Sequence, residues 1–274
     1  MPDAIFSHPR LAAVYDAFDG PRDDLAAYVS IAGELGADRV LDVGCGTGCL
    51  AILLAGTGRT VVGVDPAAAS IEVAKSKDGS GAVTWIQGDA AAIPAIGADL
   101  ALMTGNVAQV FLTDEDWAQV LRATGDALRP RGYLVFETRR PERRAWQEWA
   151  ADPGPVTLDI PGRGPVEQRR EVTAVDLPLV SFRYTYTFLA DGTVVTSDST
   201  PRPRRTGVEP GRPGLPGAGR PGGPGPSRSR VRVHRPERHL NTAKPVHRNR
   251  RRPDSALQTS RFRPRGHLED LNSV

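Results

Sequence analysis

The stretch V-L-D-V-G-C-G-T-G, at residues 40–48, decides the fold. Its first four residues have the apolar character of a short buried strand, and the glycines that follow open a helix. Glycines at this place let the backbone approach a ligand closely, and the start of a helix adds unpaired N–H groups. The stretch therefore predicts a ligand-binding turn between a strand and a helix.

Segments with strand-like and helix-like patterns alternate around this turn. Strands are expected at residues 40–43, 60–64, 83–87, 99–103 and 133–138. Helices are expected at residues 48–55 and 66–75, and a third helix should begin after Thr113. This alternation is typical of a parallel sheet covered by helices, so we expect an α/β fold with a doubly wound sheet.

Two further segments flank the alternating region. Residues 21–35 show a helical period of apolar side chains and predict a helix that covers the sheet or the mouth of a site. Residues 180–197 alternate between aromatic and polar side chains, and Asp191-Gly192 marks a turn. These residues predict an antiparallel hairpin added after the fifth strand.

The charge of the chain changes at Thr200. Residues 201–274 contain 17 Arg and one Lys against five acidic residues, although the whole chain has a formal charge of only +3. Of these 74 residues, 12 are Pro and 11 are Leu, Val or Phe, and no other large apolar type is present. Too little apolar surface is available to form a core, so we expect a disordered basic tail.

Several classes of protein are disfavoured. The longest apolar run, residues 50–55, is far shorter than the roughly 20 residues of a membrane span, and no signal peptide is visible. Cys45 and Cys49 cannot form a disulfide framework, and without a nearby histidine they are a poor metal site. We therefore expect a cytoplasmic protein that uses neither a membrane nor a metal ion.

Acidic residues stand at the C-terminal ends of three successive predicted strands. Asp42 precedes the glycine loop, Asp65 ends the second strand and Asp89 follows the third. These strand ends meet at one edge of a parallel sheet, which is where open α/β sheets bind ligands. One such acid alone would be explained as well by a helix cap or a solvated turn. The three together predict a single binding crevice.

The spacing of the glycines bears on the ligand. Dinucleotide-binding loops follow G-x-G-x-x-G or G-x-G-x-x-A, whereas here the third glycine comes one residue early and Cys49 takes its place. The carboxylate of Asp42 would repel a pyrophosphate and attract an ammonium or sulfonium group. The loop therefore favours a cationic ligand, and an NAD-dependent oxidoreductase remains an alternative.

Four motifs together resemble those of the class I S-adenosylmethionine-dependent methyltransferases of the small-molecule type. They are V-L-D-V-G-C-G-T-G at residues 40–48, V-V-G-V-D at residues 61–65, I-Q-G-D-A at residues 86–90 and L-R-P-R-G-Y-L-V-F-E at residues 128–137. The resemblance covers roughly residues 39–138. It implies a Rossmann-like fold, S-adenosyl-L-methionine as the cofactor and methyl transfer as the reaction.

The resemblance also implies which residues bind the cofactor. Asp42 and the glycine loop would face the methionine part, Asp65 the ribose hydroxyls, and Asp89 the adenine. Tyr15, in an N-terminal helix, would close over the cofactor, and Asn106 would lie near the sulfonium. The full expected set is Tyr15, Asp42, Gly44, Cys45, Gly46, Gly48, Asp65, Asp89, Ala90 and Asn106. No catalytic residue is assigned.

A small organic molecule is the expected methyl acceptor. Residues 104–107 read T-G-N-V, unlike the N-P-P-Y type of the DNA amine methylases, and the chain contains no Pro-Cys dipeptide of a cytosine methylase. Glu137 and Arg139 could orient a substrate or form surface ion pairs. Trp146 and Trp149 predict a short helix that packs in the core or walls a substrate site. A non-catalytic module with a nucleic-acid-binding tail remains a further alternative.

The expected layout has four parts: cap helices at residues 1–38, the cofactor-binding core at 39–150, the hairpin at 151–200 and the tail at 201–274. Family members continue with a helix and two more strands, which nothing after Thr200 supplies, so we expect a sheet truncated after its fifth strand. The ratio of 32 Arg to 3 Lys indicates a GC-rich gene, and such genes read out of frame yield Arg, Pro, Gly and Ala. We therefore hypothesise a shift of reading frame near Thr200.

Overall fold

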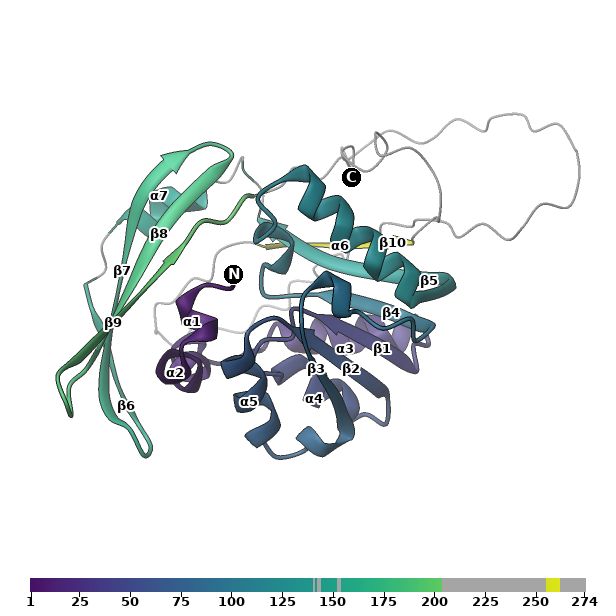
Figure 1. Ribbon diagram of the computed structural model, residues 1–274, viewed down its shortest axis with the longest axis horizontal. Helices are drawn as coiled ribbons and strands as arrows, with labels where there is room; N and C mark the ends of the chain where they lie inside the picture. Colours follow the sequence, from purple (N-terminus) through teal and green to yellow (C-terminus); the bar gives the residue numbers. More distant parts are fainter. Residues whose placement is uncertain (140, 142–143, 152–153, 204–254, 262–274) are drawn as a thin grey trace, which may run out of the picture.

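The computed structural model describes residues 1–139, 141, 144–151, 154–203 and 255–261. A six-stranded sheet with flanking helices and a separate four-stranded antiparallel sheet make up the architecture (Figure 1). Residues 204–254 and 262–274 lie outside the described residues, and with them most of the tail for which we expected disorder and a frameshift.

All five predicted strands of the parallel sheet are confirmed. They are β1 (Arg39–Val43), β2 (Thr60–Asp65), β3 (Val83–Gln87), β4 (Ala98–Met103) and β5 (Leu128–Arg139). Their order across the sheet is β5-β4-β1-β2-β3, and all neighbours run parallel. The direction of winding changes between β1 and β4, and the C-terminal ends of strands at such a switch point leave a crevice for a ligand.

Helices cover both faces of this sheet. Leu25, Tyr28 and Ala32 of α3 (Leu25–Glu34), together with the buried residues of α4 (Cys49–Ala55), cover one face. The predicted stripe of α6 (Asp114–Ala127) covers the other face. Thr113 caps α6 as expected, because its Oγ1 accepts a 3.0 Å hydrogen bond from the N–H of Asp116. The helix α5 (Ala68–Ser76) follows β2.

The remaining short elements connect these layers. Three 3-10 turns are η1 (Ser80–Ala82), η2 (Ala90–Ala92) and η3 (Val107–Gln109). The predicted short helix with the two tryptophans is α7 (Ala145–Ala150). No helix in the described part of the chain has the length and apolar content that a membrane crossing requires.

The predicted hairpin is part of a larger antiparallel sheet. Strands β8 (Leu179–Phe188) and β9 (Thr193–Ser199) form the hairpin, and β6 (Val156–Ile160) and β7 (Gly164–Asp176) extend it in the order β6-β7-β8-β9. The two added strands were not expected. Most of the side chains of β7 are polar and partly or fully exposed, so this strand lacks the apolar alternation that reveals a strand in a sequence.

Two N-terminal helices lie between the sheets (Figure 1). They are α1 (Ala4–Ser7) and α2 (Pro9–Asp19). Leu11 and Val14 of α2 are buried in one cluster with Tyr186 and Phe188 of the antiparallel sheet. The N–H of Ile5 donates a 2.8 Å hydrogen bond to Ser197 Oγ, which ties α1 to β9. The start of the chain is thus held over the edge of the sheet where the strands end.

A further strand corrects the expectation that nothing after Thr200 joins the sheet. Strand β10 (Ser255–Arg261) runs antiparallel beside β5, with register pairs from Ser255↔Arg139 to Arg261↔Tyr133. The prediction rested on the average composition of the tail, but an edge strand needs only backbone partners and few apolar side chains. The chain also stays attached just beyond Thr200, where Arg202 donates a 2.7 Å hydrogen bond to Asp114 Oδ1.

Candidate functional site

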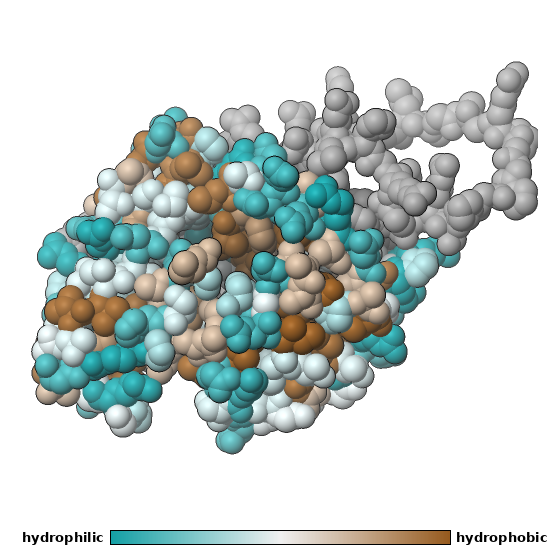
Figure 2. All heavy atoms as spheres, viewed as in Figure 1, coloured by the Kyte–Doolittle hydropathy of each residue, from teal (hydrophilic) through white to brown (hydrophobic). Residues whose placement is uncertain are grey.

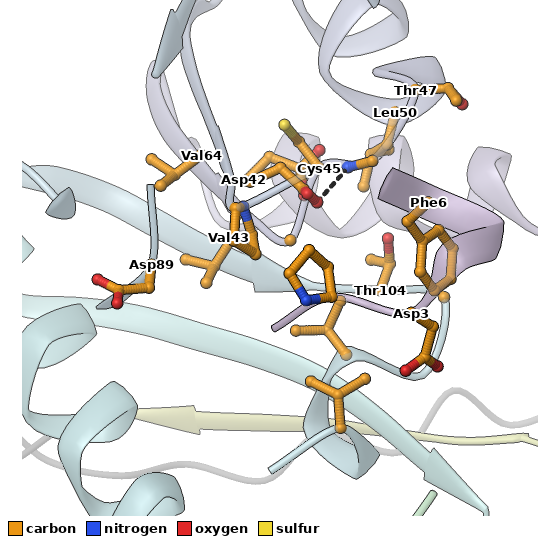
Figure 3. Close-up of a pocket in the computed structure, with 18 of the residues that line it drawn as sticks. Asp3, Phe6, Asp42, Val43, Cys45, Thr47, Leu50, Val64, Asp89 and Thr104 are labelled. Carbon is orange, nitrogen blue, oxygen red and sulfur yellow. Dashed lines mark hydrogen bonds between the residues drawn. The ribbon is translucent and has the colours of Figure 1, made fainter. Parts of the chain in front are cut away.

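A cavity of about 550 Å³ opens at the C-terminal ends of β1, β2, β3 and β4, beneath the N-terminal helices (Figure 3). It is the crevice that the three acidic strand ends predict. Eight of the ten residues expected to bind the cofactor line it: Tyr15, Asp42, Gly44, Cys45, Gly46, Asp65, Asp89 and Ala90.

The glycine loop forms the floor of the cavity. Gly44 has φ +71°, and a Cβ there would stand 2.4 Å from Val107 Cγ2, so a side chain has no room. Gly46 has φ +53° and faces open space. The Gly46 N–H donates a 2.8 Å hydrogen bond to Asp65 Oδ2, which links the loop to the end of β2. Ligand atoms can therefore approach the backbone of Gly46 closely.

Asp42 is the most unusual residue of the cavity. Its side chain is 1% exposed, and its Oδ1 has no hydrogen-bond partner in the described structure. Burial, together with the charge of Asp65, raises the pKa of Asp42 to about 7, and Arg22 opposes this shift. A buried carboxylate without a partner is costly. A cationic ligand group would remove this cost.

Asp65 and Asp89 occupy the expected strand ends with different partners. Asp65 is buried, which raises its pKa, and it accepts 2.8 Å hydrogen bonds from the N–H groups of Gly46 and Ala67. Each of its oxygens keeps a further lone pair for a ligand hydroxyl. Asp89 is exposed and caps η2, because its Oδ1 accepts a 2.9 Å hydrogen bond from the Ala91 N–H. The alternative explanation of a helix cap thus applies to Asp89 in addition to its place on the cavity wall.

Two of the expected residues do not line this cavity. Gly48 has φ +81°, and a Cβ there would lie 2.5 Å from Trp85 Cη2, so this glycine serves the packing of α4 against β3. Asn106 lies beside a neighbouring cavity. Its N–H donates a 3.1 Å hydrogen bond to Glu137 Oε1, and its Oδ1 accepts a 2.6 Å hydrogen bond from Gln109 Nε2.

The N-terminal segment supplies wall residues that the sequence did not reveal. Asp3, Phe6 and Arg22 line the cavity, and Figure 3 shows Asp3 and Phe6 on the side opposite Asp89. The Phe6 and Tyr15 rings lie 5.3 Å apart between centroids. No local motif marks these residues, because only the docking of α1 and α2 on the second sheet brings them to the strand ends.

Glu137 and Arg139 at the end of β5 take separate roles. Glu137 is 7% exposed and accepts a 2.9 Å hydrogen bond from the Tyr28 hydroxyl, so it is a buried anchor and forms no surface ion pair. The Arg139 guanidinium lies 4.7 Å from the centre of the Trp149 ring. Trp149 itself is buried against Phe182, as the core-packing interpretation predicted.

A second cavity of about 710 Å³ adjoins the first. It lies between the N-terminal helices, the loop after β4 and the antiparallel sheet, and Figure 2 shows apolar residues gathered where the surface is hollowed in this region. The residues shared by both cavities are Met1, Asp3, Phe6, Tyr15, Gly105 and Val110. A molecule in the second cavity can therefore meet a molecule in the first.

The arrangement of strands and site agrees with a comparison to known families. Residues 40–132 match the family model described as a methyltransferase domain. A protein of Oceanobacillus iheyensis, described as an uncharacterized methyltransferase, is 34% identical to the chain over 103 residues. That match covers 38% of this chain and 47% of the relative, so the chain spans about half the length of the curated relative it matches.

Solved methyltransferases share the fold well beyond residues 40–132. A S-adenosylmethionine-dependent methyltransferase from Clostridium acetobutylicum has a TM-score of 0.62 and 14% identity over 92% of this chain and 98% of its own. A SAM-bound amino pentose methyltransferase from Micromonospora echinaspora has a TM-score of 0.55 and 22% identity over 69% of this chain and 80% of its own. The Rossmann-like methyltransferase fold expected from the motifs is confirmed.

Proposed function

We propose that the chain transfers a methyl group from S-adenosyl-L-methionine to a small organic acceptor. The observation that carries this proposal is the buried Oδ1 of Asp42, which has no partner in the described structure and stands beside an open glycine loop. A carboxylate in this setting favours the ammonium and sulfonium charges of the cofactor over the phosphates of NAD. The match of residues 40–132 to the methyltransferase-domain model supports the same cofactor.

The residues around the cavity fit the parts of this cofactor. Asp42 would hold the ammonium of the methionine part, and the free lone pairs of Asp65 would accept the ribose hydroxyls. Asp89 and the Ala90 N–H would flank the adenine at the end of β3. Tyr15 would cover the cofactor from α2. Cys45 and Gly46 contribute backbone to the floor, with Gly44 shaped by packing against Val107.

The chain would promote the reaction by positioning the acceptor and by excluding water. When bound, the cofactor supplies an already activated methyl group, so the acceptor needs mainly to be held in line with it. Phe6 and Tyr15 lie in the shared wall of the two cavities and would exclude water from the place where they meet. Positioning of this kind contributes on the order of 7 kcal/mol in favourable cases. We assign no general base.

A small molecule is the proposed acceptor because the second cavity, at about 710 Å³, is a partly open hollow of small-molecule size. The amino pentose methyltransferase with the same fold supports this class of substrate. The T-G-N-V stretch after β4 supports the absence of nucleic acid from the site. We also propose a cytoplasmic location without membrane attachment, supported by the free thiols of Cys45 and Cys49.

Calorimetric titration of the full chain with S-adenosylmethionine, S-adenosylhomocysteine and NAD tests the proposal. We expect both adenosyl compounds to bind, NAD not to bind, and Asp65→Ala to abolish binding. Asp23→Ala, which changes an exposed aspartate, is the matched control. Binding of NAD alone would favour an oxidoreductase. If none of the three bound, both enzymatic functions would be excluded, leaving a non-catalytic module that acts through its basic tail.

A further inference from the structure

Aromatic side chains form one wall of the second cavity. Phe182, Tyr184 and Tyr186 project from the same face of β8, and the Phe182 and Tyr184 rings meet edge to face with centroids 5.4 Å apart. Phe18 of α2 contacts Tyr186 in the same manner, also at 5.4 Å. Such a wall favours a flat or apolar molecule, because aromatic rings contribute a large contact area and pair at defined angles.

Arg139 is the one cationic side chain among the described residues that line this cavity. Its Nε is buried without a hydrogen-bond partner, and no carboxylate of the described residues forms an ion pair with it. Burial lowers the pKa of the Arg139 guanidinium, although nearby Glu137 opposes the shift, and an arginine stays charged under ordinary conditions. The guanidinium lies over the Trp149 ring, and this contact leaves the Nε donor without a hydrogen-bond partner.

A second guanidinium, which does not line the cavity, adds positive charge near Arg139. Arg170 lies on β7 opposite Tyr184, and its Nε is likewise buried without a hydrogen-bond partner. Its charge lowers the pKa of Arg139, which means that the two cations repel each other. Glu137 offsets part of this repulsion, and an anion bound at Arg139 would offset more of it.

The acidic residues of the cavity already have partners. Asp19 pairs with Arg22 at 2.9 Å, Asp198 with Arg183 at 2.6 Å, Asp116 accepts from the Thr113 hydroxyl at 2.6 Å, and Asp3 accepts from the Ser199 hydroxyl at 2.6 Å. None of them neutralises Arg139. They would repel a doubly charged phosphate more strongly than a singly charged carboxylate.

We propose that the methyl acceptor is an aromatic carboxylate, whose carboxylate binds Arg139 with the support of Arg170 and whose ring lies against the β8 wall. This inference rests on the proposed function of the chain. A planar carboxylate matches the paired N–H donors of a guanidinium. The part of the acceptor remote from Arg139 then points toward Phe6 and Gly105, where the two cavities meet.

Binding of matched probe pairs tests this assignment without requiring methyl transfer. The full chain, both saturated with S-adenosylhomocysteine and without it, is titrated with 4-hydroxyphenylacetate, indole-3-acetate, the two corresponding amides, and phenyl phosphate. We expect each carboxylate to bind at least tenfold more tightly than its amide. Arg139→Gln should abolish the difference, Arg139→Lys should keep part of it, and Arg170→Gln should reduce it. Arg163→Gln, an exposed arginine at the turn between β6 and β7, is the control and should change nothing.

The outcomes separate this inference from the proposed function. Arg139→Gln should still bind S-adenosylhomocysteine. If the unaltered chain does not bind S-adenosylhomocysteine, only the cofactor proposal is contradicted, because the probes are also titrated in the absence of S-adenosylhomocysteine. Equal affinity for carboxylates and amides, tighter binding of phenyl phosphate, or no binding by either carboxylate would overturn the assignment. Thermal unfolding of each variant shows whether it is folded.

Discussion

The hydroxyl of Thr47 donates a 2.6 Å hydrogen bond to Asp16 Oδ1, which joins α2 to the loop before α4. The same carboxylate accepts from Lys77 at 2.6 Å. Asp16 thus fastens the helix that carries Tyr15 to the floor of the first cavity. Thr47 lines the proposed cofactor site, whereas Asp16 does not.

Asp16→Ala should weaken cofactor binding without removing any contact to the cofactor. Hydrogen bonds to charged groups contribute about 1.5–3 kcal/mol, and half-exposed groups lie toward the lower end because water screens them. We expect about tenfold weaker binding of S-adenosylhomocysteine in calorimetric titration. Asp23→Ala, an exposed neighbour in the chain, should bind like the unaltered protein. Unchanged affinity in Asp16→Ala would show that α2 needs no such anchor.

The affinity for S-adenosylhomocysteine should rise with pH up to about pH 7. Asp42 has a pKa raised to about 7, so below that pH the free protein holds a neutral acid where the ligand presents an ammonium. Binding requires the ionised form, and the affinity should therefore fall about tenfold for each pH unit below the pKa. Asp42→Asn should bind weakly at every pH. A flat profile in the unaltered protein would show that the ammonium is not held by Asp42.

The ligand-free protein should lose stability over nearly the same pH range. The pKa of Asp42 is raised from 3.8 to about 7 on folding, so the folded state binds more protons than the unfolded state between these values. Its contribution to stability is fully present below pH 3.8 and is lost as the pH rises toward 7. We expect Asp42→Asn to have a higher urea midpoint than the unaltered chain at pH 8, and the difference between the two midpoints to be smaller at pH 5. Equal midpoints at pH 8 would contradict a charged, buried Asp42.

Gly48→Ala should lower the free energy of unfolding by more than the strain of a left-handed backbone alone. Gly58→Ala is the matched control, because Gly58 has φ +86° and open space around it, whereas Gly48 has φ +81° and Trp85 in the way. Left-handed backbone alone costs a non-glycine residue about 1–3 kcal/mol. The free energy of unfolding in urea should fall in both variants, and further in Gly48→Ala. Equal losses would show that Trp85 moves aside at little cost.

Local patterns predicted the parts of the site that depend on strand ends. Asp42 and Asp65 follow apolar strands, and parallel strands bring such ends together without any knowledge of the rest of the chain. Gly48 belongs to the same motif, but it makes room for Trp85 in the packing of α4. The sequence alone does not show whether a glycine makes room for a ligand or for a neighbouring side chain. Phe6 was not predicted as a wall residue, because the docking of the second sheet decides its place. Arg139 was named as a residue that could orient a substrate or form a surface ion pair, and the end of β5 alone could not decide between these alternatives.

The end of the chain was the least predictable region. Composition averaged over residues 201–274 hid Ser255–Arg261, which adds to the sheet through backbone pairing with β5. We keep the proposal that the reading frame shifts near Thr200, and reading the adjacent frames of the gene tests it. An adjacent frame that encodes no helix and two strands of continuation would rule this origin out. A strand that contributes to folding is itself an argument for a genuine tail.

Deletion of residues 204–274 distinguishes these possibilities through stability. The deletion removes all seven register pairs between β10 and β5 and leaves β5 as an open edge, which invites pairing with other chains. We expect the melting temperature to fall by at least about 2–4 °C, the shift that a loss of ~1 kcal/mol produces in a domain of this size, and light scattering to increase with protein concentration. Deletion of residues 262–274 alone keeps β10 and should change neither measurement. Binding of S-adenosylhomocysteine should survive both deletions, because no residue after 203 lines the first cavity as described. An unchanged melting temperature in the longer deletion would mean that β10 contributes nothing to the fold, as expected of an out-of-frame sequence.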